Sequence, residues 1–129
     1  MPDIQIRIEV EVEVEAVPGE FAIHRLAAEA CLPQALFSQP LYSVLHSQNE
    51  TSVLCGVDFE IDAQATEAPY RCVRVTGQLD FSLVGVLRDL TATLASHAIS
   101  VFVVSSFDTD YLFVREENYA QTLEILNAR

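Results

Sequence analysis

The residues best suited to ligand chemistry lie in two short turns of the second half of the chain. Gly77 begins a segment that leads into a predicted helix, and Asp80 or Ser82 can cap the first helical turn. Asp108 and Asp110 lie in a turn after the next predicted strand. Glycine lets a backbone pass close to a ligand, and free amide groups at a helix start attract a carboxylate. The aspartates could accept hydrogen bonds from an ammonium group, so together the turns could bind an amino acid.

The same residues also suit purely structural roles. Glycine is a common turn residue, Asp80 and Ser82 are good helix caps, and Asp108 with Asp110 can shape a tight turn. The two aspartates also resemble half of a magnesium or calcium loop. Such loops need a glycine and further oxygen ligands, which this segment lacks. We therefore predict no metal site, and both the ligand-binding and the structural interpretation remain open.

No arrangement of residues indicates catalysis. His24, His46 and His97 are far apart, and the sequence lacks Gly-x-Ser-x-Gly and related nucleophile motifs. Every basic residue is an arginine, which excludes a Schiff-base lysine and a P-loop lysine. His97 follows a predicted helix and suits its C-terminal cap. We predict a protein that is not an enzyme and needs no cofactor.

The charge of the chain excludes several classes of partner. Its 129 residues include seven arginines and nineteen acids, which gives a formal net charge of −12. An acidic surface repels phosphate backbones and anionic lipid, so we expect neither nucleic-acid nor membrane binding. Residues 1–62 hold eleven acids and two arginines, whereas residues 63–129 hold eight acids and five arginines. The acidic excess is therefore concentrated in the first half.

The termini and cysteines predict a cytoplasmic protein. The first residues lack the basic start and apolar core of a signal peptide, and no apolar run approaches a membrane span of ~20 residues. Cys31, Cys55 and Cys72 are an odd number without a CxxC pair, which is typical of reduced thiols. We expect Cys55 and Cys72 to be small buried residues of strands.

The first half of the sequence predicts mostly strands. Apolar and polar residues alternate over residues 4–15, which is typical of a strand with one buried face. Pro18 and Gly19 predict a turn into a second strand over residues 21–26, and thus a hairpin. A short helix is expected over residues 34–38, followed by strands over residues 41–46 and 52–57.

Four glutamates of the first strand share one face. Glu9, Glu11, Glu13 and Glu15 lie about 7 Å apart along it, because a strand rises ~3.4 Å per residue. Like charges at this spacing repel each other. A solvated edge that discourages aggregation, a basic partner or a neighbouring strand with arginines would each relieve the repulsion.

The second half alternates strands and helices. Residues 62–69 have no periodicity and predict a boundary, which divides the chain into halves at residues 1–62 and 70–129. A strand over residues 71–75 precedes a helix with Leu83, Leu87, Leu90 and Leu94 on one face. Residues 99–104 predict a central strand and residues 110–115 another strand. A last helix begins at residue 116 and buries Tyr119, Leu123 and Leu126. This order predicts an α+β fold with either one sheet or two.

Residues 75–87 and 99–112 resemble the small tandem ACT-domain proteins of bacteria, which are similar to the ACT repeats of CASTOR-type arginine sensors. Residues 18–26 and 49–55 resemble the degenerate first half of that family. The resemblance implies a ferredoxin-like ACT fold with two halves in tandem. It further implies a non-catalytic sensor or regulatory module, a homodimer, and a small ligand such as an amino acid at the interface of the halves.

The ligand-binding residues expected from this resemblance and from the two turns come from both halves. They are Ser52, Val53, Gly77, Gln78, Leu79, Asp80, Phe81, Ser82, Ser105, Asp108 and Asp110. The alternative is a structural or protein-interaction module that binds no ligand and uses its acidic N-terminal strand.

Overall fold

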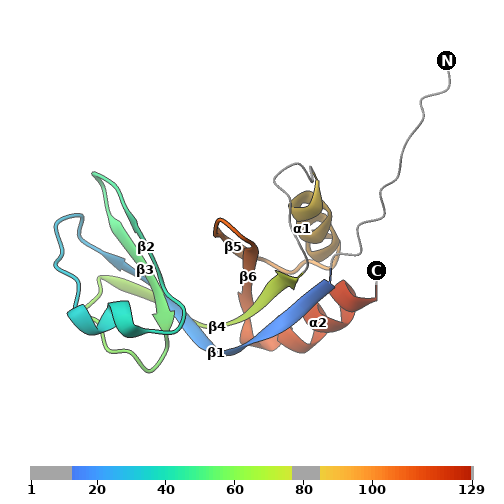
Figure 1. The fold of residues 1–129 in the computed structure, drawn as a ribbon, viewed down its shortest axis with the longest axis horizontal. Coiled ribbons are helices and arrows are strands. Elements are labelled where there is room, and N and C mark those ends of the chain that lie inside the picture. The colour runs from blue at the N-terminus through green and yellow to red at the C-terminus, as the bar shows by residue number, and fades with distance from the viewer. Residues whose placement is uncertain (1–12, 77–84, 129) are drawn as a thin grey trace, which may run out of the picture.

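The computed structural model describes residues 13–76 and 85–128, with six antiparallel strands in one sheet of order β2-β3-β1-β4-β6-β5 (Figure 1). The predicted α+β class is confirmed, with one sheet across both halves. Residues 77–82, predicted to bind ligand, and Glu9 and Glu11 lie outside the described residues. The elements in chain order are β1 (Glu13–Leu26), η1 (Gln34–Ser38), β2 (Ser43–His46), β3 (Thr51–Gly56), β4 (Ala65–Thr76), α1 (Val86–Ser96), β5 (Phe102–Ser105), β6 (Asp110–Arg115), η2 (Glu116–Asn118) and α2 (Tyr119–Asn127).

Strand β1 runs through Pro18 and Gly19 without reversing, so the predicted hairpin at this point is wrong. Its pairing with β4 is interrupted between Val17 and Phe21, where the register shifts. Proline has no backbone N–H to give to a ladder, and Gly19 has a φ of +107°, which a glycine adopts without strain. The dipeptide therefore forms an irregularity that bends one long strand.

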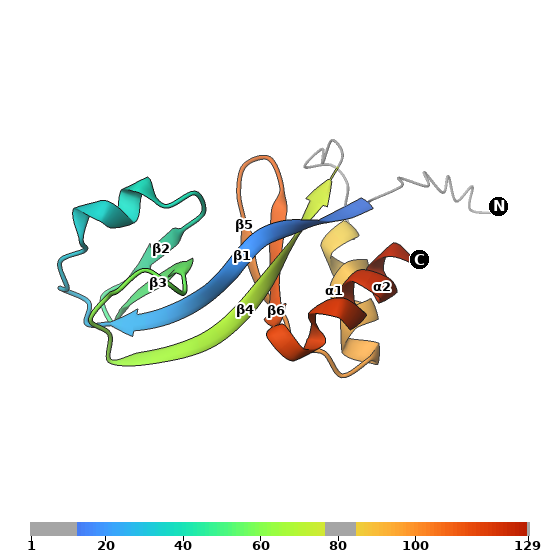
Figure 2. The same ribbon diagram turned by 90° about the horizontal axis from the view of Figure 1, so that it is seen from below.

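The bend divides the sheet into two lobes that share β1 and β4. After the bend, from Phe21 onward, β1 pairs with β3 on one side and with the start of β4 on the other. Before the bend, up to Val17, β1 pairs with the end of β4. The N-terminal lobe adds β2, β3 and η1, and the C-terminal lobe adds β5, β6, α1 and α2. Figure 2 shows β1 and β4 running side by side between the lobes.

Strand β4 also begins earlier than the sequence predicts. Residues 65–69 were expected in a boundary segment, but they belong to β4, where Ala65 and Thr66 pair with Arg25 and His24 of β1. Because both faces of this end of the strand are largely exposed, it lacks the apolar periodicity that would have identified it.

Two helices cover one face of the C-terminal lobe. Leu90 and Leu94 of α1 are fully buried against Val73 and Val75 of β4, as the leucine spacing predicts. The last helical segment also agrees with prediction, because Tyr119 and Leu126 are buried in the same cluster and Leu123 packs against it. His97 is the C-cap residue of α1, and its Nδ1 lies 3.0 Å from the Thr93 carbonyl oxygen, as expected for a capping role.

Strand β5 is an edge strand, so the prediction of a central strand over residues 99–104 is wrong. Strand β6 lies between β4 and β5 and is antiparallel to both. The run is apolar because each face of the strand has its own packing. Val103 packs against the helix-covered cluster, and Phe102 and Val104 pack against a cluster that includes Phe113.

The N-terminal lobe has a small core of its own. Leu36 of η1 is fully buried with Val53 and Cys55 of β3. The structure thus confirms the predicted short helix and the two strands after it, and Cys55 and Cys72 are both buried in strands, as expected.

Removal of a buried leucine from α1 tests the helix-covered core. We expect Leu94→Ala to lower the free energy of unfolding by about 2–5 kcal/mol, because it leaves a cavity in a closed cluster. Leu45→Ala is the matched control, since Leu45 is 65% exposed, and should change stability by less than about 0.5 kcal/mol. Urea denaturation followed by circular dichroism measures both. Equal effects of the two substitutions would contradict this packing.

The buried His24 makes stability depend on pH. Burial lowers the pKa of His24, whose Nδ1 lies 2.8 Å from Thr66 Oγ1. The unfolded state binds the proton more readily, so the free energy of unfolding should fall as the pH drops below the ordinary histidine pKa of about 6.5. His24→Gln should reduce the fall measured between about pH 7.5 and about pH 5.5. The exposed His97→Gln is the control, and an unchanged dependence in His24→Gln would refute the assignment.

Candidate ligand-binding site

A pocket of about 870 Å³ lies where the two lobes meet. We call it the interlobe pocket. Three backbone segments form most of its wall: the β1 bend, the connection from η1 to β2 and the turn after β3. The lining residues are Val17, Pro18, Gly19, Glu20, Phe21, Gln39, Pro40, Leu41, Gly56, Val57, Asp58, Phe59, Arg74 and Tyr111. The size suits a small organic molecule.

Hydrogen bonds hold these three segments together. The Val57 backbone N–H donates to the Glu20 carbonyl oxygen at 3.0 Å. The Gly56 N–H donates to Gln39 Oε1 at 3.3 Å, which ties the η1–β2 connection to the end of β3. A Cβ at position 56 would lie only 3.1 Å from that oxygen, so Gly56 allows this close approach. The wall of the pocket is thus fixed by contacts within the described chain.

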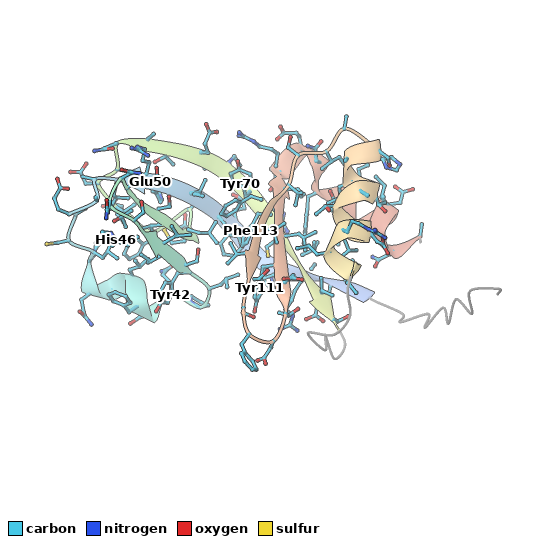
Figure 3. The ribbon with its side chains drawn as sticks, turned by 90° about the horizontal axis from the view of Figure 1, so that it is seen from above. Tyr42, His46, Glu50, Tyr70, Tyr111 and Phe113 are labelled. Atoms are coloured by element: carbon cyan, nitrogen blue, oxygen red, sulfur yellow. The ribbon has the colours of Figure 1, made fainter. Side chains whose placement is uncertain are left out.

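Aromatic packing forms the floor. Phe21 is 5% exposed, and its ring packs edge-on against Phe113 with centroids 5.4 Å apart. Cys72 and Leu54 are buried in the same cluster. Figure 3 shows Tyr70, Phe113 and Tyr111 gathered at the middle of the molecule, between the lobes. A ligand in the pocket would therefore rest against an apolar, close-packed surface.

The pocket carries charges of both signs. Arg74 is the one basic residue in the described part of the lining and forms an ion pair with Glu15 of β1, in which both side chains are nearly half exposed. Glu20 and Asp58 also line the pocket, and within the described part of the chain neither carboxylate has a hydrogen-bond or ion-pair partner. An apolar floor beside both kinds of charge can hold a zwitterion.

The Glu15–Arg74 ion pair bears on the predicted repulsion between the glutamates of the first strand. Of the three ways proposed to relieve this repulsion, the structure shows one at Glu15, where the neighbouring strand β4 supplies Arg74. The first part of β1 also forms an edge of the C-terminal lobe, because β3 pairs with β1 only from Phe21 onward.

The structure brings some of the predicted site residues together. Ser105 Oγ donates a hydrogen bond to the Asp110 carboxylate across the β5–β6 turn. Thr109 Oγ1 donates to the Val75 carbonyl oxygen at 2.5 Å, so this turn lies beside the end of β4. Asp108 is exposed in the same turn.

Ser52 and Val53 lie elsewhere in the described chain. They pair with Arg25 and His24 near the end of β1, and Val53 is fully buried in the N-terminal core. Ser52 Oγ donates to Glu50 Oε1 at 2.8 Å. In Figure 3, Glu50 lies in the N-terminal lobe, well away from Tyr111, the residue after Asp110. Within one chain, Ser52 and Val53 therefore do not meet the β5–β6 turn, and a shared ligand site stays a prediction.

The interlobe pocket was not predicted from the sequence. Its wall residues come from separate segments and carry no common motif. The signal that could have found it is the dipeptide Pro18-Gly19 between the strand patterns of residues 4–15 and 21–26, because such an interruption can mark a bulge as well as a turn.

The interlobe pocket lies over a thiol that is a poor nucleophile. Burial raises the pKa of the Cys72 thiol under its floor to about 12, so this thiol is not a nucleophile at neutral pH. No group of three or more histidine, cysteine, aspartate or glutamate residues in residues 13–76 and 85–128 could hold a metal ion. In the same residues, no helix is long and apolar enough to cross a membrane.

Residues 65–128 match the family model of the ACT domain. This segment comprises β4, α1, β5, β6 and α2, with the short η2 between the last two. This part of the chain is therefore similar to the ACT domain, and ACT domains are small-molecule-binding regulatory domains.

Three solved structures resemble nearly the whole chain. A protein from Agrobacterium tumefaciens is 26% identical with a TM-score of 0.78, and the alignment covers 89% of this chain and 86% of that one. A Vibrio cholerae protein of unknown function, described as a possible transport protein, is 21% identical with a TM-score of 0.74, covering 91% and 88%. A structure of aspartokinase alpha and beta subunits is 13% identical with a TM-score of 0.63, covering 90% and 95%.

The two structures below 25% identity show a shared fold alone. No curated protein matches the sequence. The comparisons therefore show the fold and a match to the ACT domain over residues 65–128, while the ligand has to be inferred from the chain itself.

The closed floor of the pocket can be tested by thiol reactivity. Cys31 is exposed, whereas Cys55 and Cys72 are buried and burial raises both of their pKa values. We expect an aromatic disulfide reagent at about pH 8 to modify Cys31 quickly and the other two thiols only after unfolding in urea. Cys31→Ser should remove the fast reaction. Fast modification of Cys72 in the folded protein would show that the floor is open.

Proposed function

We propose that this chain binds an amino acid and acts as a sensor or regulatory module, with the ligand held where its two ACT-like halves meet. The interlobe pocket carries the proposal. It lies between the lobes, has the volume for a small molecule, and combines an aromatic floor with Arg74, Glu20 and Asp58.

The chemistry of an amino acid fits these groups. A carboxylate can accept hydrogen bonds from Arg74, whose guanidinium has five donors and gives only Nη2 to Glu15. An ammonium group can donate to Glu20 or Asp58. The ACT domain supports a regulatory role, and the fold shared with aspartokinase is consistent with it.

The proposal includes a cytoplasmic location and a homodimer. Among the described strands, β2 and β5 are the two ends of the strand order, and a second copy could continue the ladder at either end. Residues 77–82 with Ser105, Asp108 and Asp110 form a second candidate location for the ligand, which the sequence predicts. Ser52 lies away from the β5–β6 turn of its own chain and could contribute to such a site from a second copy, whereas Val53 is fully buried.

Thermal unfolding in the presence of each of the twenty amino acids tests the proposal. A ligand of the folded state should raise the free energy of unfolding by about 2.7 kcal/mol at a hundred times its Kd, and the melting temperature should rise with concentration. Unchanged melting curves for all twenty would refute amino-acid binding. They would favour the alternative of an interaction module that uses its acidic N-terminal strand.

Matched variants separate the two candidate locations. If the ligand lies in the interlobe pocket, Asp108→Asn with Asp110→Asn should keep the full ligand-induced shift in melting temperature. A shift that these substitutions abolish, in a protein that still folds by circular dichroism, would place the ligand at the β5–β6 turn instead.

A further inference from the structure

Building on the proposed function, we infer that the interlobe pocket recognises a primary ammonium group attached to a large apolar body. Its ligand class is then an amino acid with a large uncharged side chain, together with the amine that remains when the carboxylate is removed. Glu20 and Asp58 would bind the ammonium group, and the aromatic floor would bind the body.

The backbone holds the two acids at one side of the pocket. Glu20 accepts a hydrogen bond through its carbonyl oxygen from the N–H of Val57, and Asp58 is the next residue. Both side chains are exposed and line the pocket, and the described residues provide neither carboxylate with a cationic partner. Two carboxylates without a partner among the described residues thus line one pocket, and each attracts a positive group.

The pocket is less suited to bind a negatively charged group than a positively charged one. Arg74 already pairs with Glu15, so a neighbouring acid offsets the charge of the one base in the lining. A ligand carboxylate would compete with Glu15 for the guanidinium. The described lining therefore holds two acids without a partner and one base that is already paired, and the ammonium should contribute more to affinity than the carboxylate.

The apolar floor of the pocket determines which kind of group, attached to the ammonium, would fit the pocket. Phe21 is nearly fully buried, and Leu41, Phe59 and Tyr111 are half-buried around it. An uncharged aromatic or branched body would cover these side chains and remove apolar surface from water. A second charged group over this floor would lose its hydration without gaining a partner.

Four probes that differ in one group each test the inference: L-phenylalanine, phenethylamine, 3-phenylpropionate and L-lysine. Isothermal titration calorimetry on the full chain should show binding of the first two with affinities within about tenfold of each other. It should show no binding of 3-phenylpropionate, which lacks the ammonium group. Binding of 3-phenylpropionate as tight as that of L-phenylalanine, or tighter binding of L-lysine, would overturn the inference.

Charge-neutral variants identify the groups that bind the ammonium. Glu20→Gln and Asp58→Asn should each weaken phenethylamine binding by about tenfold or more, as loss of a charge-assisted hydrogen bond does. Glu60→Gln and Asp62→Asn are the controls, since both acids are exposed and neither lines the pocket. Circular dichroism and the unfolding midpoint check that all variants fold. Equal binding by pocket variants and controls would refute the assignment.

The outcomes separate this inference from the proposed function. Amino-acid binding that survives the double substitution of Glu20 and Asp58 leaves the proposed function in place and overturns the inference. Binding of phenethylamine without binding of any amino acid supports ammonium recognition and refutes an amino-acid ligand. Absence of binding by every probe and every amino acid refutes both.

Discussion

The architecture depends on one continuous strand that pairs with the same neighbour on both sides of a bend. Strand β1 passes through Pro18 and Gly19 and resumes its pairing with β4 at Phe21, with a register shift before Phe21 and another before Ile23. A reversal at this point would have made two small hairpins. Because the strand continues, the two lobes share one sheet, and the irregular stretch between them becomes a wall of the interlobe pocket.

The two faces of the sheet have different consequences for function. In the C-terminal lobe, α1 and α2 close one face over Val73 and Val75, which leaves no space for a ligand there. The other face has no helix among the described residues and carries the cluster of Phe21, Leu54, Cys72 and Phe113. Helix packing thus supplies rigidity on one side, while the aromatic cluster supplies a preformed surface on the other.

Sequence patterns predicted the elements whose burial is periodic. The leucines of α1 and the apolar face of α2 are regular over several turns, and β2 and β3 are bounded by polar turns, so each was located from the sequence. The wrong predictions concern segments whose local sequence pattern is compatible with two different structures. Pro18-Gly19 fits either a turn or a bulge, and the apolar run of β5 fits either a central strand or an edge strand packed on two sides. The pocket depends on contacts between distant segments, such as Val57 with Glu20, which no local pattern contains.

Hydrogen–deuterium exchange with a stabilising amino acid tests the central claim that a small ligand binds between the lobes. The account predicts slower exchange in the presence of ligand for the amides of residues 17–21, 39–41 and 56–59, which form the pocket wall, with little change at the exposed β2–β3 turn. Protection that avoids these three segments and appears only around the β5–β6 turn would contradict it.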